Sequence, residues 1–428
     1  MKRGKVLSVE LSTQTLDGQQ LYYATLDLPA QMHEMRDACQ RARVWDYTIN
    51  PKSITVLECS YPPDLDTFEL ADTATIEELN LFAGRVANFT DKERVALKAV
   101  FQKLSMQGRF SDGIMAKDLI NMTYGLSEMI VVEGIRNDRD LGEFVIHNDM
   151  DPAVTNVPDE SLHLLDKAQI GQTQRESDQG MYIDNCYVVT ADYALPTVYD
   201  GRLLHNAELP QPWFAFKLKV AEAPIAQPGD TEHAAEWIRL PMEREDAQAV
   251  AKRHNEERIE ECVCYGFQSS IPQISELQFF NMREFEILNR LAWQMSHMPV
   301  EEQCKFKAAL ELEQPTTMTE LADVADNLYK YDFTNSLNDA GSYFRRVLAI
   351  CLHRQFDKSW IRDLSCESEG AEMLRSIGGK VTPYGVISGR DQPLYQMIPR
   401  QEEPETMDQD ESEDLDEEHT SEMGGMAL

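Results

Sequence analysis

Apolar side chains recur along this chain with two kinds of spacing, and each half of the sequence shows the two in the same order. Near the start, residues 5–9 and 21–26 alternate apolar and polar positions, and the second segment leads into Leu28-Pro29. Such alternation predicts β-strands, because successive side chains of a strand point to opposite faces. A helix is predicted next, from four residues at helical spacing: Met32, Met35, Cys39 and Ala42.

The second half of the chain repeats this order. Residues 213–218 and 237–241 have strand character, the latter again closing in Leu-Pro, and a helix is expected over 247–254. One more strand is predicted in each half, at 54–59 and at 261–267. Each half is therefore predicted to begin with a small α/β unit.

The clearest correspondence is a helix pair at residues 76–101 and 285–310, matched at a constant offset. Thr90 and Glu93 have the spacing of a capping box at the start of the second helix, where the other copy has Pro299. The matched positions have the spacing of a helical core: Ile76 with Phe285, Leu79 with Leu288, Asn80 with Asn289, Phe82 with Leu291, Ala83 with Ala292, Val86 with Met295, and Phe89 with Met298.

Two later blocks also correspond, 118–126 with 320–328 and 140–144 with 339–343. The alternative explanation is that any two helices with apolar residues at helical spacing match each other reasonably well. Three shared features favour an internal duplication instead: the repeated Leu-Pro, the asparagines Asn80 and Asn289, and the glycines Gly142 and Gly341.

The predicted fold class is α+β, an elongated multi-domain chain of two related halves, each with a small α/β head, a helical middle and a mixed α/β end. The expected head, middle and end are 1–70, 71–150 and 151–207 in the first half, and 208–277, 278–356 and 357–400 in the second. Residues 401–428 form a tail with 12 acidic residues and no lysine or arginine. This tail is expected to be disordered, because it has few aliphatic side chains to bury.

Charge narrows the functional possibilities. The chain has 74 Asp plus Glu against 40 Lys plus Arg, a formal net charge of -34, and the tail accounts for only 12 of these negative charges. A strongly acidic body favours solubility, salt adaptation or a positively charged partner, and it disfavours direct binding of nucleic-acid phosphates.

The cysteines and the N-terminal residues favour a cytoplasmic location. None of the eight cysteines forms a Cys-x-x-Cys pair, and Cys262 and Cys264 are expected on one face of a strand as buried thiols, with a metal site as the weaker alternative. No run of 18 apolar residues occurs, and Met1-Lys2-Arg3-Gly4 leads into a predicted strand rather than into a signal sequence.

The common catalytic motifs are absent from the sequence. It contains no P-loop, GxGxxG, GxSxG or HExxH, and no two histidines lie four residues apart. Residues 147–151 resemble part of a calcium loop but lack its remaining acids. We therefore expect no enzymatic activity, no cofactor and no metal. An unrecognised enzyme is the alternative, and it would need a pocket of convergent polar groups with perturbed carboxylates.

The order of these parts resembles the ArdA-type antirestriction proteins carried by plasmids, conjugative transposons and phages. The resemblance covers most of each half, as pattern rather than identity. It rests on the Leu-Pro-plus-helix head, on 79–83 leading to Phe89, and on 118–123, 140–144, 157–170, 288–292, 306–311 and 328–333. Members of that family are shorter single-copy chains that pair as elongated dimers. This chain departs from them in holding two copies and an added tail.

The resemblance implies inhibition of Type I restriction–modification enzymes by imitation of DNA. Duplex DNA carries about one negative charge per 1.7 Å of its axis, so an elongated acidic protein can enter the same basic groove and associate quickly. No membrane partner is expected, and the family's homodimer is in doubt because this chain already holds two copies. The second hypothesis is an acidic adaptor of a mobile genetic element that binds another basic protein.

Candidate contact residues are the acids outside the apolar helix stripes. For each of them, an ordinary solvated position is the alternative interpretation. They are Asp138, Asp140, Glu143, Asp149, Asp151, Asp159 and Glu160 in the first half, and Glu301, Glu302, Glu311, Glu313, Glu320, Asp323 and Asp326 in the second.

Overall fold

The computed structural model of this chain describes residues 4–14, 21–44, 53–71, 74–201, 214–222, 235–274, 281–351 and 366–395. Helices and small antiparallel sheets form a mixed α+β fold, which confirms the predicted class. Below, the first half means residues 4–201 and the second half means residues 214–395. The tail from Gln401 lies outside the described residues, so its disorder stays a prediction.

The first half begins with a three-stranded antiparallel sheet, ordered β2-β1-β3, that packs against one helix. Leu7, Val9 and Leu11 are at most 1% exposed, because alternate side chains of the central strand point into the core. The elements are β1 (Leu7–Gln14), β2 (Leu21–Leu28), α1 (Met32–Ala42) and β3 (Ser53–Cys59).

The second half begins with a sheet of the same order, β8-β7-β9, again with one helix. Its elements are β7 (Phe216–Ala221), β8 (Glu236–Leu240), α9 (Arg244–Arg253) and β9 (Val263–Ser269). In both sheets the register between the central and third strands shifts once, at Ser8/Val9 and at Lys219/Val220. The predicted head strands and helices are thus confirmed within the described residues.

Each head leads into a helical middle. Its helices are α2 (Ile76–Val86), α3 (Asp91–Met106) and α4 (Ala116–Met122) in the first half, and α10 (Phe285–His297), α11 (Val300–Glu313) and α12 (Met318–Asp326) in the second. The predicted capping box of Thr90 and Glu93 is present, and Pro299 occupies the N-cap position of α11 without a side-chain hydrogen bond. Short 3₁₀ turns connect the larger elements: η1 (Pro63–Thr67), η2 (Leu126–Glu128), η3 (Asp159–Leu164), η4 (Ile259–Glu261), η5 (Pro272–Ile274), η6 (Met282–Glu284) and η7 (Leu328–Lys330).

The two shared asparagines make the same contact in each half. Asn80 on α2 accepts a hydrogen bond from the Ala30 backbone N–H and donates one to the Ala30 carbonyl, at 2.6 and 3.1 Å. Asn289 on α10 does the same with Met242, at 2.9 Å each way. Each amide thus fastens the middle to the residue that follows the Leu-Pro of the head, which explains why one residue type occurs at both positions.

Each half ends in a unit where two helices pack beside a small sheet. The first end unit, residues 131–188, contains β4 (Val131–Glu133), α5 (Asp138–His147), α6 (Pro152–Thr155), α7 (Lys167–Asp178), β5 (Met181–Ile183) and β6 (Cys186–Val188). The second end unit, residues 333–387, contains β10 (Phe333–Thr334), α13 (Ala340–Cys351), α15 (Glu367–Ser376), β11 (Lys380–Thr382) and β12 (Gly385–Ile387).

The last strand of each end unit lies between the other two, in the orders β4-β6-β5 and β10-β12-β11. Because β4 pairs with β6, the expected boundary at 150/151 falls inside the first end unit, and the unit is better drawn from residue 131. The boundary at 356/357 likewise falls between the paired strands β10 and β12.

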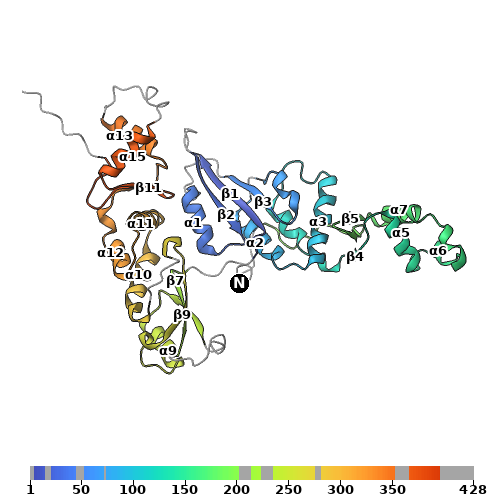
Figure 1. The fold of residues 1–428 in the computed structure, drawn as a ribbon, viewed down its shortest axis with the longest axis horizontal. Helices are drawn as coiled ribbons and strands as arrows, with labels where there is room; N and C mark the ends of the chain where they lie inside the picture. The colour runs from blue at the N-terminus through green and yellow to red at the C-terminus, as the bar shows by residue number, and fades with distance from the viewer. Residues whose placement is uncertain are drawn as a thin grey trace, which may run out of the picture.

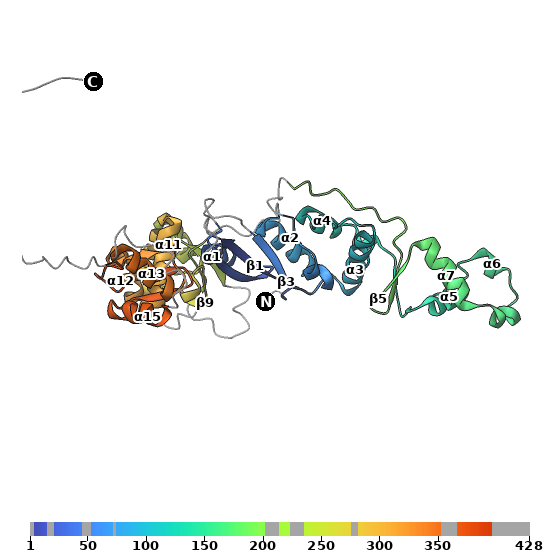
Figure 2. The same ribbon diagram turned by 90° about the horizontal axis from the view of Figure 1, so that it is seen from above.

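The molecule is elongated. The first half runs along its long axis, with α5, α6 and α7 at the far end, and the second half lies across the opposite end beside α1 (Figures 1 and 2). Head, middle and end units therefore follow the same order in both halves. That the halves arose by duplication stays a prediction.

Candidate functional site

All seven acids predicted for the first half fall in the first end unit, at the outermost part of the molecule (Figure 2). They lie on α5, on η3 and in the turn that leads into α6. Asp159 begins η3, and its side chain lies outside the described part of the structure. The structure therefore brings residues that are separated by up to 22 positions in the sequence into one projecting unit.

Asp138 is held inside the unit rather than displayed. Its carboxylate accepts hydrogen bonds from Arg175 Nε at 2.7 Å, from Arg175 Nη2 at 3.2 Å and from the Tyr182 hydroxyl at 2.7 Å. The Arg175 guanidinium lowers the pKa of Asp138, against a smaller opposing effect of burial. Asp138 thus joins α5 to α7 and to β5.

Three further acids in this unit serve local structure. Asp140 accepts from the Arg136 backbone N–H at 3.1 Å, and Asp151 caps α6 by accepting from the Ala153 backbone N–H at 2.8 Å. Glu143 pairs with Lys167 at 3.0 Å, and this ammonium group lowers the pKa of Glu143. Asp140 and Glu143 lie on the surface of α5, and Asp151 lies at the start of α6. The side chains of all three residues therefore remain at least partly exposed to solvent.

Asp149 and Glu160 are exposed, and among the described residues neither has an ion-pair partner. The structure adds Glu176 on α7, which is also exposed and whose carboxylate accepts a hydrogen bond from Gln172 at 2.9 Å. Sequence reasoning missed Glu176, although it lies outside the apolar positions of α7 by the same criterion. All three are exposed carboxylates of the first end unit without an ion-pair partner in the described part.

Five of the seven acids predicted for the second half have an ion-pair or hydrogen-bond partner. Glu313 and Asp323 both contact Arg390, at 3.2 and 2.7 Å, and Asp326 contacts Arg290 at 3.2 Å. Glu320 caps α12 through Thr316 and Thr317, which lower its pKa, and Glu311 accepts from Gln273 Nε2 at 3.0 Å. Glu301 and Glu302, in the first turn of α11, are exposed without an ion-pair partner in the described part.

Charge is distributed unequally between the two end units. The first end unit has 12 acidic and 4 basic residues. The described residues of the second end unit, 333–351 and 366–387, have 4 acidic and 4 basic residues. Of the two end units, the first therefore carries the excess of negative charge.

A buried polar network joins the two halves. Asp37 on α1 accepts from Lys307 Nζ of α11 at 2.6 Å and from the Tyr384 hydroxyl at 2.8 Å, while its other oxygen accepts from Arg41 at 3.0 Å. Lys307 also donates to Gln40 Oε1 at 2.6 Å. Asp37, Lys307 and Tyr384 are each at most 5% exposed, so this contact is shielded from solvent.

Arg43 and Tyr22 extend the contact between the halves. Arg43, 2% exposed, donates from Nε to the Asn335 carbonyl at 3.0 Å and from Nη2 to the Tyr384 carbonyl. The Tyr22 hydroxyl donates to the Ser336 carbonyl at 2.6 Å. Burial lowers the pKa of Arg43, and burial together with the nearby Asp37 carboxylate raises the pKa of Tyr384. The two halves are thus fixed relative to each other by directional bonds.

The described residues contain no group of three or more His, Cys, Asp or Glu that could hold a metal ion, and the carboxyl pKa values that shift among them all fall. Cys262 and Cys264 are free thiols, and burial raises the pKa of Cys262 to about 11. No described helix has both the length and the apolar character to cross a bilayer.

A comparison of the chain with protein-family models and with curated protein sequences finds no match.

Proposed function

We propose that this protein is a DNA-mimicking inhibitor that occupies the DNA-binding groove of a Type I restriction–modification enzyme. One observation carries the proposal most directly: an elongated molecule whose outermost unit holds 12 acidic and 4 basic residues (Figure 2). The resemblance of the sequence pattern to antirestriction proteins supplies the class of partner.

The physical basis is electrostatic. Proteins that bind duplex DNA line a groove with lysine and arginine to neutralise phosphates. Carboxylates displayed on a projecting unit present the same sign of charge to that groove, which accelerates association and favours docking in one orientation. The paired acids of the first end unit contribute indirectly, because Asp138 and Arg175 hold α5 against α7 and so keep the displayed acids on a rigid support.

The arrangement also predicts that the two halves differ in role. The first end unit supplies the negative surface, while the second end unit is close to neutral in its described part. In this proposal the second half serves chiefly as the base that holds α1 and the first half in place through Asp37, Lys307 and Arg43.

The test compares two triple variants for their ability to displace DNA from a purified Type I complex. One variant neutralises displayed acids of the first end unit: Asp149→Asn, Glu160→Gln and Glu176→Gln. The matched control neutralises three exposed acids at the start of α9: Glu243→Gln, Glu245→Gln and Asp246→Asn. The first variant is expected to need about tenfold more protein for half-displacement, and the control is expected to resemble the unmodified protein.

Equal displacement by both variants would overturn the assignment of the first end unit as the contact surface. If neither variant nor the unmodified protein displaced DNA, the partner would have to be another basic protein, as the adaptor hypothesis holds.

A further inference from the structure

The sheet of the second head has one cationic face, in a chain of net charge -34. Lys217 on β7 is directly opposite Arg239 on β8, and Lys219 is directly opposite Trp237. Alternate positions of a strand share one face, as do residues directly opposite each other on paired strands, so these four side chains lie together. The residues between them on each strand are buried in the core beneath α9. We call the side of the sheet that faces away from α9 the cationic face.

The three strands of this sheet contain one carboxylate, and it lies on the other face. Glu236 on β8 contacts Arg253 of α9 at 3.0 Å. Burial lowers the pKa of Lys217, and the nearby Arg239 lowers it further. Like charges directly opposite each other destabilise a sheet, so an anion that binds over them relieves a repulsion as well as gaining attraction.

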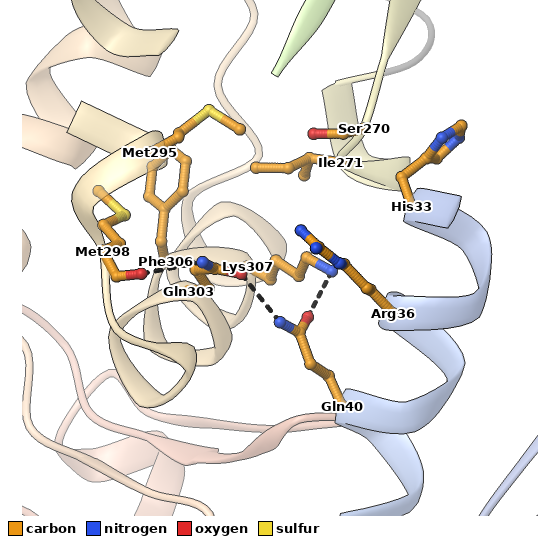
Figure 3. A pocket seen from close by; sticks show the side chains of 10 residues that line it. All are labelled: His33, Arg36, Gln40, Ser270, Ile271, Met295, Met298, Gln303, Phe306 and Lys307. Atoms are coloured by element: carbon orange, nitrogen blue, oxygen red, sulfur yellow. Dashed lines mark hydrogen bonds between the residues drawn. The ribbon is translucent and has the colours of Figure 1, made fainter. Parts of the chain in front are cut away.

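Helix α1 covers only one end of the cationic face. Lys217 is 9% exposed, its Nζ lies 4.1 Å from the centre of the Phe214 ring, and that ring packs edge-on against His33 of α1. Figure 3 shows His33 on the side of α1 that is opposite the residues following β9. At the other end of the face Arg239 is exposed and Trp237 is 46% exposed. The face is therefore accessible to a partner.

The Trp237 ring crosses this accessible part. A carbon added at Gly266 of β9 would meet the Trp237 ring at 3.1 Å and Lys219 Cβ at 3.2 Å. The ring thus extends from β8 past the Lys219 stem to β9, and the glycine leaves room for it. Lys219 has no ion-pair partner among the described residues. The cationic face thus combines charged donors with one exposed aromatic ring.

The equivalent face of the first head has the opposite charge. Counting from the Leu-Pro of each head and then across the paired strands, Arg239 corresponds to Asp27 and Lys219 corresponds to Glu10. Asp27 is exposed and contacts Lys5 at 3.5 Å. The two heads share their strand order, so the positive charge is a property of the second head and not a requirement of the fold.

The acidic tail of the chain is long enough to reach the cationic face. Residues 401–428 hold 12 acidic residues and no lysine or arginine. The described structure ends at residue 395 in the second end unit, and the 33 residues that follow can span about 110 Å at about 3.3 Å each. A compact body of the size of the second half is only about 40 Å across. Its head and its end unit lie at opposite ends, with α10, α11 and α12 between them (Figure 1).

We propose that the acidic tail, residues 401–428, docks on the cationic face of the second head, with its carboxylates against Lys219 and Arg239. Because the tail is attached to the same chain, its effective concentration at the face is on the order of millimolar. Single-stranded nucleic acid is another polyanion that suits cations beside an exposed aromatic ring. A free polyanion, however, is repelled by the large negative charge of this chain. The docked tail shields the face from such competitors, and the proposal does not depend on DNA mimicry.

The test is zero-length carbodiimide cross-linking of the full chain at about 50 mM salt, with the bonds mapped by mass spectrometry. Isotope-labelled and unlabelled protein are mixed, so that bonds within one chain are distinguished from bonds between chains. Lys219 is expected to form bonds with tail carboxylates of its own chain about tenfold more often than Lys252, an exposed lysine on α9. These bonds should become rare at about 500 mM salt.

Three results of the cross-linking would overturn the proposal. They are the absence of bonds between Lys219 and the tail, bonds at Lys252 as frequent as those at Lys219, and bonds that form only between different chains.

Two double variants of the full chain locate the contact. Lys219→Glu with Arg239→Glu reverses the charge of the face, and Arg244→Glu with Lys252→Glu is the matched control at exposed cations of α9. A glutamate-specific protease is expected to cleave the tail about tenfold faster in the first variant, because the tail is released, and at the unmodified rate in the control. Circular dichroism checks that both variants are folded. Equal cleavage rates in the two variants would show that the tail does not bind the face.

A labelled oligothymidylate tests the competing partner. The unmodified protein is expected not to bind it at about 150 mM salt. If it did bind, and the Lys219→Glu with Arg239→Glu variant did not, the cationic face would belong to nucleic acid and the proposal would be wrong.

Discussion

At the scale of single residues, Asp37 shows why the contact between the halves occurs only once. Counting from Pro29 and Pro241, Asp37 of α1 corresponds to Ala249 of α9, and Arg43 corresponds to Asn255. In the middle units, Lys307 corresponds to Lys98, which pairs instead with Asp184 at 2.8 Å. The residues that fasten α1 to the second half are therefore missing from α9. As a result, α9 cannot make the same contact with the first half.

Lys307→Met is expected to lower the free energy of unfolding by about 3 kcal/mol, because it leaves the buried Asp37 carboxylate without its closest cation. Chemical denaturation followed by circular dichroism measures the effect. Lys98→Met is the matched control and should cost less than about 1 kcal/mol, since Asp184 is half exposed. A loss of equal size in both variants would show that the buried network contributes no more than a surface pair.

Asp138 gives a prediction about pH. Its pKa is lowered in the folded protein by Arg175, so its stabilising contribution is present above the pKa of the unfolded chain and is lost as pH falls through the folded value. Asp138→Asn should therefore be less stable than the unmodified protein by about 1–2 kcal/mol near neutral pH. The difference should shrink as pH falls from about 5 to about 3. A difference that stayed constant over this range would contradict the ion-pair interpretation.

The sequence could identify acids outside the helix cores, but not which of them are displayed. Asp138 and Glu160 look alike in the sequence, because the partner of Asp138, Arg175, lies 37 residues away. By contrast, the capping role of Thr90 and Glu93 was predictable, since both partners lie within one helical turn. Ion pairs and hydrogen bonds between residues distant in the sequence depend on the fold, and they cannot be predicted from sequence spacing alone.

At the scale of elements, the close crossing of α5 and α7 depends on glycine. A side-chain carbon added at Gly142 would overlap the Lys167 carbonyl, and one added at Gly171 would overlap the Asp138 carbonyl. Gly370 follows Gly341 by the same number of residues as Gly171 follows Gly142, and a carbon added there would overlap the Ala340 carbonyl. Of the two glycines matched in the sequence, Gly142 is therefore a position of close helix contact, whereas a carbon added at Gly341 would meet only side-chain atoms, at 3.1 Å or more.

Gly142→Ala is expected to destabilise the first end unit by about 1–3 kcal/mol, because the helices must move apart. Gly84→Ala in α2 is the control: no atom lies within 4 Å of the added carbon, so alanine should stabilise that helix by up to about 1 kcal/mol. Thermal unfolding of both variants checks the prediction. Stabilisation by Gly142→Ala would show that the helices do not pack as described.

The elements themselves were largely predictable, and their distant pairings were not. Strands and helices of the two heads and middles follow from local periodicity, and their order recurs as expected. The strand β6 was not predicted individually, and its position between β4 and β5 depends on pairing with a segment more than 50 residues earlier. The expected boundary at 150/151 separated these partners, because local signals change there from helix to turn.

At the scale of the whole molecule, shape and charge act together. The first half extends along the long axis and carries its acidic excess at the far end, while the second half anchors the near end through a buried network (Figures 1 and 2). This arrangement presents a negative surface on a rigid support, as a competitor for a basic groove requires.

The most direct test of DNA mimicry is displacement of labelled duplex DNA from a purified Type I restriction–modification complex, followed by fluorescence anisotropy. At about 50 mM salt, the protein is expected to displace the DNA at concentrations near that of the complex, and displacement should weaken as salt is raised to about 200 mM. DNA that stays bound at low salt in the presence of a large excess of the protein would contradict the account.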